Sequence, residues 1–288
     1  MKLLFVVPHY WKPTGGNYGS LGADPSPRVA ALSRLIAALH SQFGPQQAVL
    51  QIRDRTLQPA NQQKAAEIEI AIFTTQGCHV LEYLSCPKNL YRHCPVECDP
   101  MFLGFEAQAY LRDRQQDFDW YGFLEDDLII EDPLFFLKLH WFQTNVGPQA
   151  VLQPNRFESL VAEGKPHKLY VDGPNSGVAV QFWPDREALQ LTGQFLGFPM
   201  TFERSVNPHS GCFFLSQAQV QKLVTDPCFL DRDTRFVGPL ESAASLSLMK
   251  VFRIYKPAAP QASFLEICHH PANFLKNLRF SVGAVTPH

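Results

Sequence analysis

An uninterrupted apolar run that ends in three consecutive carboxylates is the feature that most limits how this chain can fold. The run is Tyr121-Gly122-Phe123-Leu124, and Glu125-Asp126-Asp127 follow it directly. A short strand without polar alternation is typical of a sheet whose two faces are both covered. Ligands bind at strand ends in such sheets, and three adjacent anions repel one another. The pattern therefore predicts an α/β domain with an acidic site at a strand end.

Other segments of the chain fit the same architecture. Apolar runs predict buried strands at residues 2–7, 48–52, 68–75, 151–154, 169–172, 211–215 and 264–267. Helical spacing of apolar residues predicts helices at residues 26–43, 104–115, 134–142, 217–224 and 241–249. A long glycine-containing loop is expected at residues 9–25. Because no linker divides the chain, we expect one domain of mixed α/β type.

Composition excludes several classes of protein. The 288 residues include 25 Lys and Arg against 27 Asp and Glu, so the basic excess of a nucleic-acid-binding protein is missing. No apolar stretch approaches the roughly 18 residues that span a bilayer, and the run at residues 2–7 is too short for a signal peptide. Seven cysteines, an odd number without a regular framework, suit a reducing compartment. We therefore expect a soluble cytoplasmic protein with no transmembrane segment and no nucleic-acid partner.

The acidic tripeptide is the first candidate site. Carboxylate oxygens are preferred ligands of hard divalent cations such as Mg²⁺ and Mn²⁺, and a cation would relieve the repulsion between them. The same acid-x-Asp spacing recurs at residues 97–99, 117–119 and 231–233, so the position after a buried strand is what distinguishes this copy. The alternative is a solvated acidic turn that caps the next helix.

With its preceding strand, Glu125-Asp126-Asp127 resembles the Asp-x-Asp motif of nucleotide-sugar glycosyltransferases of the GT-A fold. The resemblance implies a single three-layer α/β/α domain with a mixed central sheet. Its nucleotide-binding half would cover about residues 1–130 and its acceptor half about 131–270, before a short C-terminal tail. It further implies a nucleotide-sugar donor, a saccharide or other hydroxyl acceptor, and Mn²⁺ or Mg²⁺ as cofactor. By the family pattern Asp127 binds the metal, Glu125 acts through the ribose or a bound water, and Asp126 reaches the donor sugar.

Two residues of the N-terminal half are further candidates, Asp54 from the resemblance and Arg28 from its own position. Asp54 follows the second expected strand, where such enzymes often contact the base or the ribose. Arg28, at the start of the first expected helix, is a candidate partner for phosphate, although an exposed helix arginine is the alternative.

The C-terminal half supplies the remaining candidates. Residues 207–212 resemble the acceptor loop, and the polar residues 155–158 are candidates for an acceptor groove. Glu241 resembles the catalytic base of inverting members, or else it is a first-turn acid favoured by the helix dipole. His269 and His270 resemble the C-terminal histidine that completes the metal shell. Adjacent residues of a strand face opposite ways, so at most one of the two points at the site.

Three alternatives remain beside a GT-A enzyme. A non-catalytic domain of the same fold would hold metal or saccharide without turnover, but it needs neither Glu241 nor the histidine pair. A glycoside hydrolase uses two separated carboxylates, whereas here they cluster in one tripeptide. The proline- and glycine-rich segment at residues 8–22 looks more like the opening of GT-B glycosyltransferases, which need two nucleotide-binding domains. Inverting and retaining mechanisms share the acidic motif, so both stay open.

Overall fold

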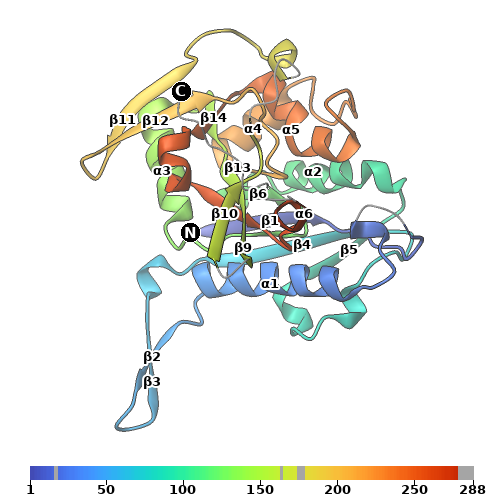
Figure 1. The fold of residues 1–288 in the computed structure, drawn as a ribbon, viewed down its shortest axis with the longest axis vertical. Helices are drawn as coiled ribbons and strands as arrows, with labels where there is room; N and C mark the ends of the chain where they lie inside the picture. Colours follow the sequence, from blue (N-terminus) through green and yellow to red (C-terminus); the bar gives the residue numbers. More distant parts are fainter. Residues whose placement is uncertain (16–18, 163–164, 174–178, 278–288) are drawn as a thin grey trace.

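The computed structural model describes residues 1–15, 19–162, 165–173 and 179–277. Its central sheet has five strands in the order β13-β6-β1-β4-β5 (Figure 1). β1 (Lys2–Pro8), β4 (Glu67–Thr75), β5 (Arg92–Val96) and β6 (Trp120–Leu124) are parallel, and β13 (Cys212–Ser216) is antiparallel to β6. The fold is therefore mixed α/β with a mixed sheet, as expected.

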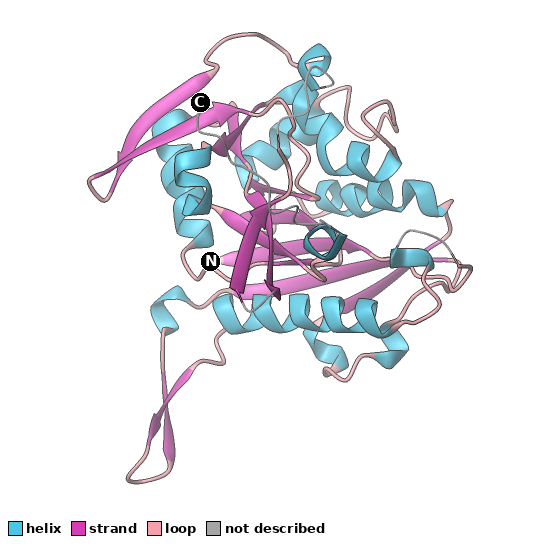
Figure 2. Ribbon diagram, viewed as in Figure 1, coloured by secondary structure: helices cyan, strands magenta, loops and turns pink. Residues whose placement is uncertain are grey.

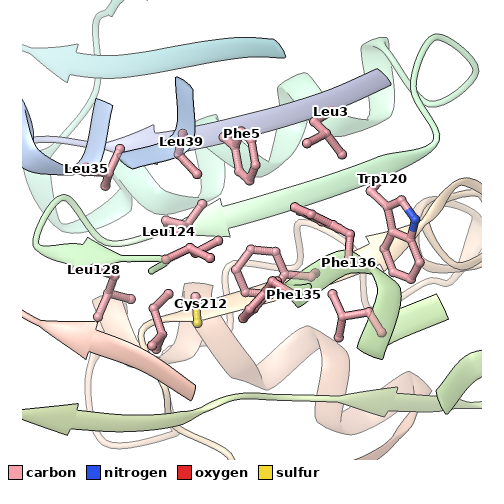
Figure 3. Packing of buried hydrophobic residues seen from close by; sticks show 14 of the residues in the cluster. Leu3, Phe5, Leu35, Leu39, Trp120, Leu124, Leu128, Phe135, Phe136 and Cys212 are labelled. Carbon is pink, nitrogen blue, oxygen red and sulfur yellow. The ribbon is translucent and has the colours of Figure 1, made fainter. Parts of the chain in front are cut away.

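Both faces of the central sheet are buried under helices. Leu3, Phe5 and Val7 of β1 pack into one core with α1 (Ser26–Phe43) and α3 (Phe135–Val146). Figure 3 shows this core, with Leu35 and Leu39 of α1 close to Phe5. The alternate β1 residues pack into a second core with α2 (Leu103–Asp113), α4 (Gln217–Thr225) and α5 (Pro239–Val251). Burial on both faces explains why these strands have no polar alternation.

Gly122 in β6 is a point of close packing. A Cβ atom there would lie 2.8 Å from Cδ1 of Phe5 and 3.2 Å from ring atoms of Phe214. A glycine therefore lets two aromatic rings of the neighbouring strands approach the β6 backbone.

Two smaller sheets flank the central one. Their orders are β10-β9-β15-β7 and β11-β12-β14-β8. The strands are β7 (Leu128–Ile129), β8 (Ala150–Leu152), β9 (Asn155–Ala162), β10 (Lys165–Tyr170), β11 (Gln190–Phe195), β12 (Phe198–Arg204), β14 (Arg253–Pro257) and β15 (Glu266–His269). Because β7 directly follows the acidic tripeptide and pairs with β15, the last strand ends beside that tripeptide.

Short helices occupy the remaining connections. They are η1 (Gly19–Leu21), η2 (Gln62–Lys64), η3 (Leu81–Tyr83), η4 (Lys88–Leu90), η5 (Pro100–Phe102), η6 (Ala179–Phe182), η7 (Ala259–Phe264) and α6 (Asn273–Asn277). Over the residues that the structure describes, no helix combines the length and apolar character needed to cross a membrane. Parts of the loop at 9–25 (residues 16–18) and of the C-terminal tail (278–288) lie outside the described residues.

The strand predicted at residues 48–52 is wrong in its burial. β2 (Ala48–Gln51) pairs only with β3 (Thr56–Pro59), and every residue of both strands is exposed. The hairpin extends away from the rest of the molecule (Figures 1 and 2). A short apolar run does not by itself distinguish a core strand from an exposed hairpin.

Several strands had no clear sequence signal. β5 contains Pro95 and lies at the sheet edge, where proline is tolerated because one side of the strand needs no partner. Strands β9, β11, β12 and β14 were likewise not among those predicted. The last strand begins at Glu266 instead of Phe264, which belongs to η7.

Candidate functional site

The acidic tripeptide lies where the carboxyl end of β6 meets α1 and the end of β15. The N–H of Glu125 donates to the carbonyl of Gly211 at 2.9 Å, and the N–H of His270 donates to the carbonyl of Asp127, also at 2.9 Å. Asp126 and Asp127 are less than a tenth exposed. The structure therefore places the carboxylates in a mostly buried turn at the carboxyl end of a parallel strand, where ligands bind in α/β sheets.

Asp126 uses both carboxylate oxygens in contacts within the protein. His9 Nδ1, at the end of β1, lies 2.5 Å from Asp126 Oδ2, and the N–H of Val80 donates to His9 Nε2 at 3.0 Å. Since Nε2 accepts, the proton of the neutral ring is on Nδ1, which donates to Asp126. Arg28 donates to the other oxygen of Asp126. Asp126 therefore joins β6 to β1 and α1, and its predicted contact with a donor sugar stays a prediction.

Arg28 bridges the two aspartates. Its Nη1 also donates to Asp127 Oδ2 at 3.0 Å, and its side chain is about four-fifths buried. Asp126 raises the pKa of Arg28 against the opposing effect of burial, with Asp127 adding to it. The structure thus brings Arg28 from the first turn of α1 to the acidic turn, where it offsets part of the negative charge.

Asp127 and His269 face each other. Asp127 Oδ1 is buried and has no hydrogen-bond partner in the described part of the chain, and Oδ2 lies 3.6 Å from Nε2 of His269. His269 Nδ1 lies 2.7 Å from Oε1 of Glu158, a fully buried carboxylate that also accepts from two backbone N–H groups of α6. A carboxylate of this kind fixes the imidazole tautomer with Nε2 free, which is how proteins orient histidine toward a metal.

The buried charges shift the pKa values of the site. Burial, reinforced by Asp127, raises the pKa of Glu125 to about 7. Burial opposes ionisation of Asp127 too, but the nearby imidazole of His269 and the charge of Arg28 prevail and lower its pKa to about 2. Burial lowers the pKa of His269, yet the contact with Asp127 outweighs it and the net shift is upward. Asp127 therefore stays ionised near neutral pH.

A divalent cation fits part of this arrangement. Within the described ranges of the chain, no group of three or more His, Cys, Asp or Glu side chains is arranged to hold a metal ion. Asp127 Oδ1 and His269 Nε2 offer one oxygen and one nitrogen, which leaves most of a six-coordinate shell for phosphate oxygens and water. Such a shared shell is usual for Mg²⁺ bound with a nucleotide.

His270 is not brought to the acidic turn through its side chain. His270 directly follows β15, and its Nδ1 lies 3.5 Å from Nη1 of Arg34. Burial lowers the pKa of His270, and Arg34 lowers it further. The contact described for the His270 imidazole is thus with Arg34, and its role as a metal ligand stays a prediction.

Asp54 also lies apart from the other candidates. It occupies the turn between β2 and β3, where it is exposed in the projecting hairpin (Figure 1). The expectation that it contacts a base or ribose assumed that residues 48–52 form a core strand ending at the site. Because that segment is an exposed hairpin, the structure does not bring Asp54 to the acidic turn.

Glu241 lies in the first turn of α5, as expected. A Cβ atom on Gly238 would be 2.8 Å from its Oε2, so the carboxylate folds back toward the helix start. Ser245, one turn later on the same face, donates to the carbonyl of Pro208 at 3.4 Å. This face of α5 therefore adjoins residues 207–212, and the role of Glu241 as a base stays a prediction.

Sequence reasoning missed a buried ionic network next to the turn. Arg156 Nη1 lies 3.7 Å from Oε2 of Glu125, and its Nη2 donates to Asp172 Oδ1 at 2.8 Å. Lys256 donates to the carbonyl of His209 at 2.9 Å. The sequence signal for this network was weak. Arg156 belongs to a segment distinguished only by its polarity, and Lys256 lies in a strand without clear periodicity.

Comparisons with known proteins give structural neighbours only. No protein-family model matches the chain, and no curated protein sequence matches it. The structure is similar to the crystal structure of S. aureus TarS, with a TM-score of 0.46 and 12% identity over 93% of this chain and 36% of that chain. For S. aureus TarS 1–349 the values are 0.45, 11%, 93% and 60%. The chain therefore spans less than two thirds of the length of either neighbour.

Proposed function

We propose that the protein is a metal-dependent glycosyltransferase that moves a sugar from a nucleotide-sugar donor to a hydroxyl acceptor. The observation that carries the proposal is the unpartnered buried Oδ1 of Asp127 beside His269, whose tautomer is held by Glu158. This pair lies at the carboxyl end of β6 in a sheet covered on both faces. A single GT-A-like domain, with its donor half before about residue 130 and its acceptor half after it, is part of the proposal.

In this proposal each residue of the site has its own role. Asp127 and His269 would hold Mn²⁺ or Mg²⁺, and the bound ion would supply Lewis-acid stabilisation of a nucleotide diphosphate leaving group. Arg28 turns its guanidinium to the phosphate oxygens, for which arginine is well suited. Asp126 keeps Arg28 and the β1 end in place through its two oxygens. Glu241 takes the proton of the acceptor hydroxyl if the reaction inverts the anomeric centre.

A binding experiment tests the metal assignment. We expect UDP or GDP to bind measurably only with Mn²⁺, and Asp127→Ala to abolish that binding while the circular dichroism spectrum is unchanged. Asp113→Ala, at the exposed end of α2, is the matched control and retains wild-type binding. Unchanged nucleotide affinity in Asp127→Ala would contradict the metal site.

A turnover experiment separates an enzyme from a non-catalytic domain. A panel of nucleotide sugars is incubated with the wild-type chain, with and without Mn²⁺, and released nucleotide is measured. We expect Mn²⁺-dependent release from at least one donor. Metal-dependent binding without release from any donor or acceptor mixture favours the alternative, a saccharide-binding domain of the same fold.

A further inference from the structure

A cavity of about 240 Å³ lies beside the acidic turn. Its wall comes from the start of β9 and the ends of β10, β12 and β14, and its charged members are Arg156, Asp172, Glu203, Arg204 and Lys256. Ligand pockets for drug-sized molecules have about 300 to 1,000 Å³. The volume therefore suits a group of roughly monosaccharide size.

The buried charges of the wall are mostly positive. Arg156, Arg204 and Lys256 are each less than a tenth exposed. Among the wall carboxylates, the side chain of Asp172 is 5% exposed, whereas Glu203 is exposed. Arg204 forms an ion pair with Asp185, which lies outside the wall. Arg156 donates a hydrogen bond to Oδ1 of Asp172. Lys256 Nζ is left 3.7 Å from Oδ2 of Asp172, too far for a hydrogen bond.

The polar atoms of the cavity wall that lack a hydrogen-bond partner indicate which kind of ligand would complement it. Among the described residues, Nε of Arg156 and Nε and Nη2 of Arg204 are buried donors without a hydrogen-bond partner, and Oδ2 of Asp172 is a buried acceptor without one. Lys256 Nζ donates to the carbonyl of His209, and burial lowers the pKa of this ammonium group. Buried donors and cations left unpaired are costly, and a ligand that supplies acceptors and negative charge removes that cost.

Building on the proposed function, we propose that this cavity is the acceptor subsite and that it takes a hydroxylated group bearing an oxyanion, either a carboxylate or a phosphate. The oxyanion lies against Lys256 and the guanidinium of Arg156. A hydroxyl of the same group donates to Oδ2 of Asp172. Arg156 links the cavity to the acidic turn through its contact with Glu125, so an acceptor held here is next to the donor site.

Calorimetry with three matched hexoses tests the subsite. Glucose, glucuronate and glucose 6-phosphate are titrated into the full chain without nucleotide or metal. We expect at least one anionic sugar to bind at least tenfold more tightly than glucose, and the stronger of the two identifies carboxylate or phosphate as the recognised group. Lys256→Met is expected to lose at least tenfold of that affinity, whereas Lys256→Arg, which retains the charge, keeps most of it.

The controls keep the outcome decisive. Lys168→Met removes a partly exposed lysine paired with Glu266 outside the cavity, and it leaves the affinity unchanged. If Lys256→Met does not fold, displacement of the bound sugar by inorganic phosphate on the wild-type chain replaces it. Equal binding of all three sugars, or no binding of either anion, overturns the subsite. The nucleotide titrations with Mn²⁺ are independent of these probes, so failure here is distinguishable from failure of the proposed function.

Discussion

His9 and Asp126 are joined by a 2.5 Å hydrogen bond although 117 positions separate them in the sequence. The bond connects the carboxyl ends of β1 and β6, which are neighbouring strands of the central sheet. The His9 ring is fully buried, and its second nitrogen accepts from Val80. The His9 side chain therefore helps to hold the acidic turn through both of its ring nitrogens.

Replacing His9 by phenylalanine keeps the ring shape and removes both hydrogen bonds. A buried backbone N–H and one carboxylate oxygen lose their partners, so we expect the free energy of unfolding to fall by about 2 to 4 kcal/mol. Urea denaturation measures it. His140→Phe, at an exposed position of α3, is the control and changes stability by no more than about 0.5 kcal/mol. Wild-type stability of His9→Phe would show that the bond contributes nothing.

Gly211→Ala tests the packing of Glu125. Gly211 has φ +62°, and a Cβ atom there would lie 2.4 Å from Oε2 of Glu125. Gly77→Ala is a matched control, because Gly77 has φ +65° and nothing within 4 Å of its Cβ position. Both variants carry the same backbone strain. Because of the clash, we expect the free energy of unfolding to fall by at least about 1 kcal/mol more in Gly211→Ala than in Gly77→Ala. Equal losses of stability in the two variants would mean that Glu125 relaxes freely.

Glu158→Gln tests how His269 is oriented. The glutamine amide keeps the shape of the side chain but carries no negative charge. It therefore fixes the imidazole tautomer of His269 less strongly than the carboxylate does. If Asp127 and His269 hold the cation, loss of such a support lowers metal affinity by about 10- to 100-fold. Mn²⁺ binding followed by electron paramagnetic resonance checks it, with exposed Glu67→Gln as the control. Wild-type Mn²⁺ affinity in Glu158→Gln removes the orienting role.

Glu241→Gln tests the base. A positioned base contributes about 10² to 10⁴ in rate, so transfer should fall by that factor while nucleotide binding stays at the wild-type level. Single-turnover transfer and calorimetry measure the two quantities separately. Full activity in this variant would leave Glu241 as a helix-start acid and favour a retaining mechanism or another base, such as Asp231 or Asp233.

His209 gives stability a pH dependence. Burial, with Arg156 as the next cause, lowers its pKa to about 4, whereas an unfolded histidine titrates near 6.5. Between these values the unfolded chain binds a proton that the folded chain does not, so this residue's contribution to stability is lost as pH falls from about 6.5 to about 4, by up to about 3 kcal/mol. His209→Gln should flatten the stability profile in that window, measured by urea denaturation at several pH values. An exposed control, His140→Gln, leaves the slope in place.

Local patterns in the sequence predicted the layers of the fold and the acidic turn. The apolar runs of β1, β4 and β6 and the periodicity of α1, α2 and α5 are readable because strand and helix burial repeat over a few residues. Pro27 and Pro239 mark helix starts for the same local reason. The position of Glu125-Asp126-Asp127 after β6 followed from adjacency alone.

Only the tertiary structure decided which residues surround that turn. Arg28, His9 and Glu158 reach their partners across 98 to 117 positions of the chain, and no local pattern carries such a pairing. The same holds for His269, whose imidazole lies 3.6 Å from Asp127, and for the hairpin of β2 and β3, whose residues are all exposed. Burial and pairing over long separations depend on how the elements dock, and docking is a property of the whole chain.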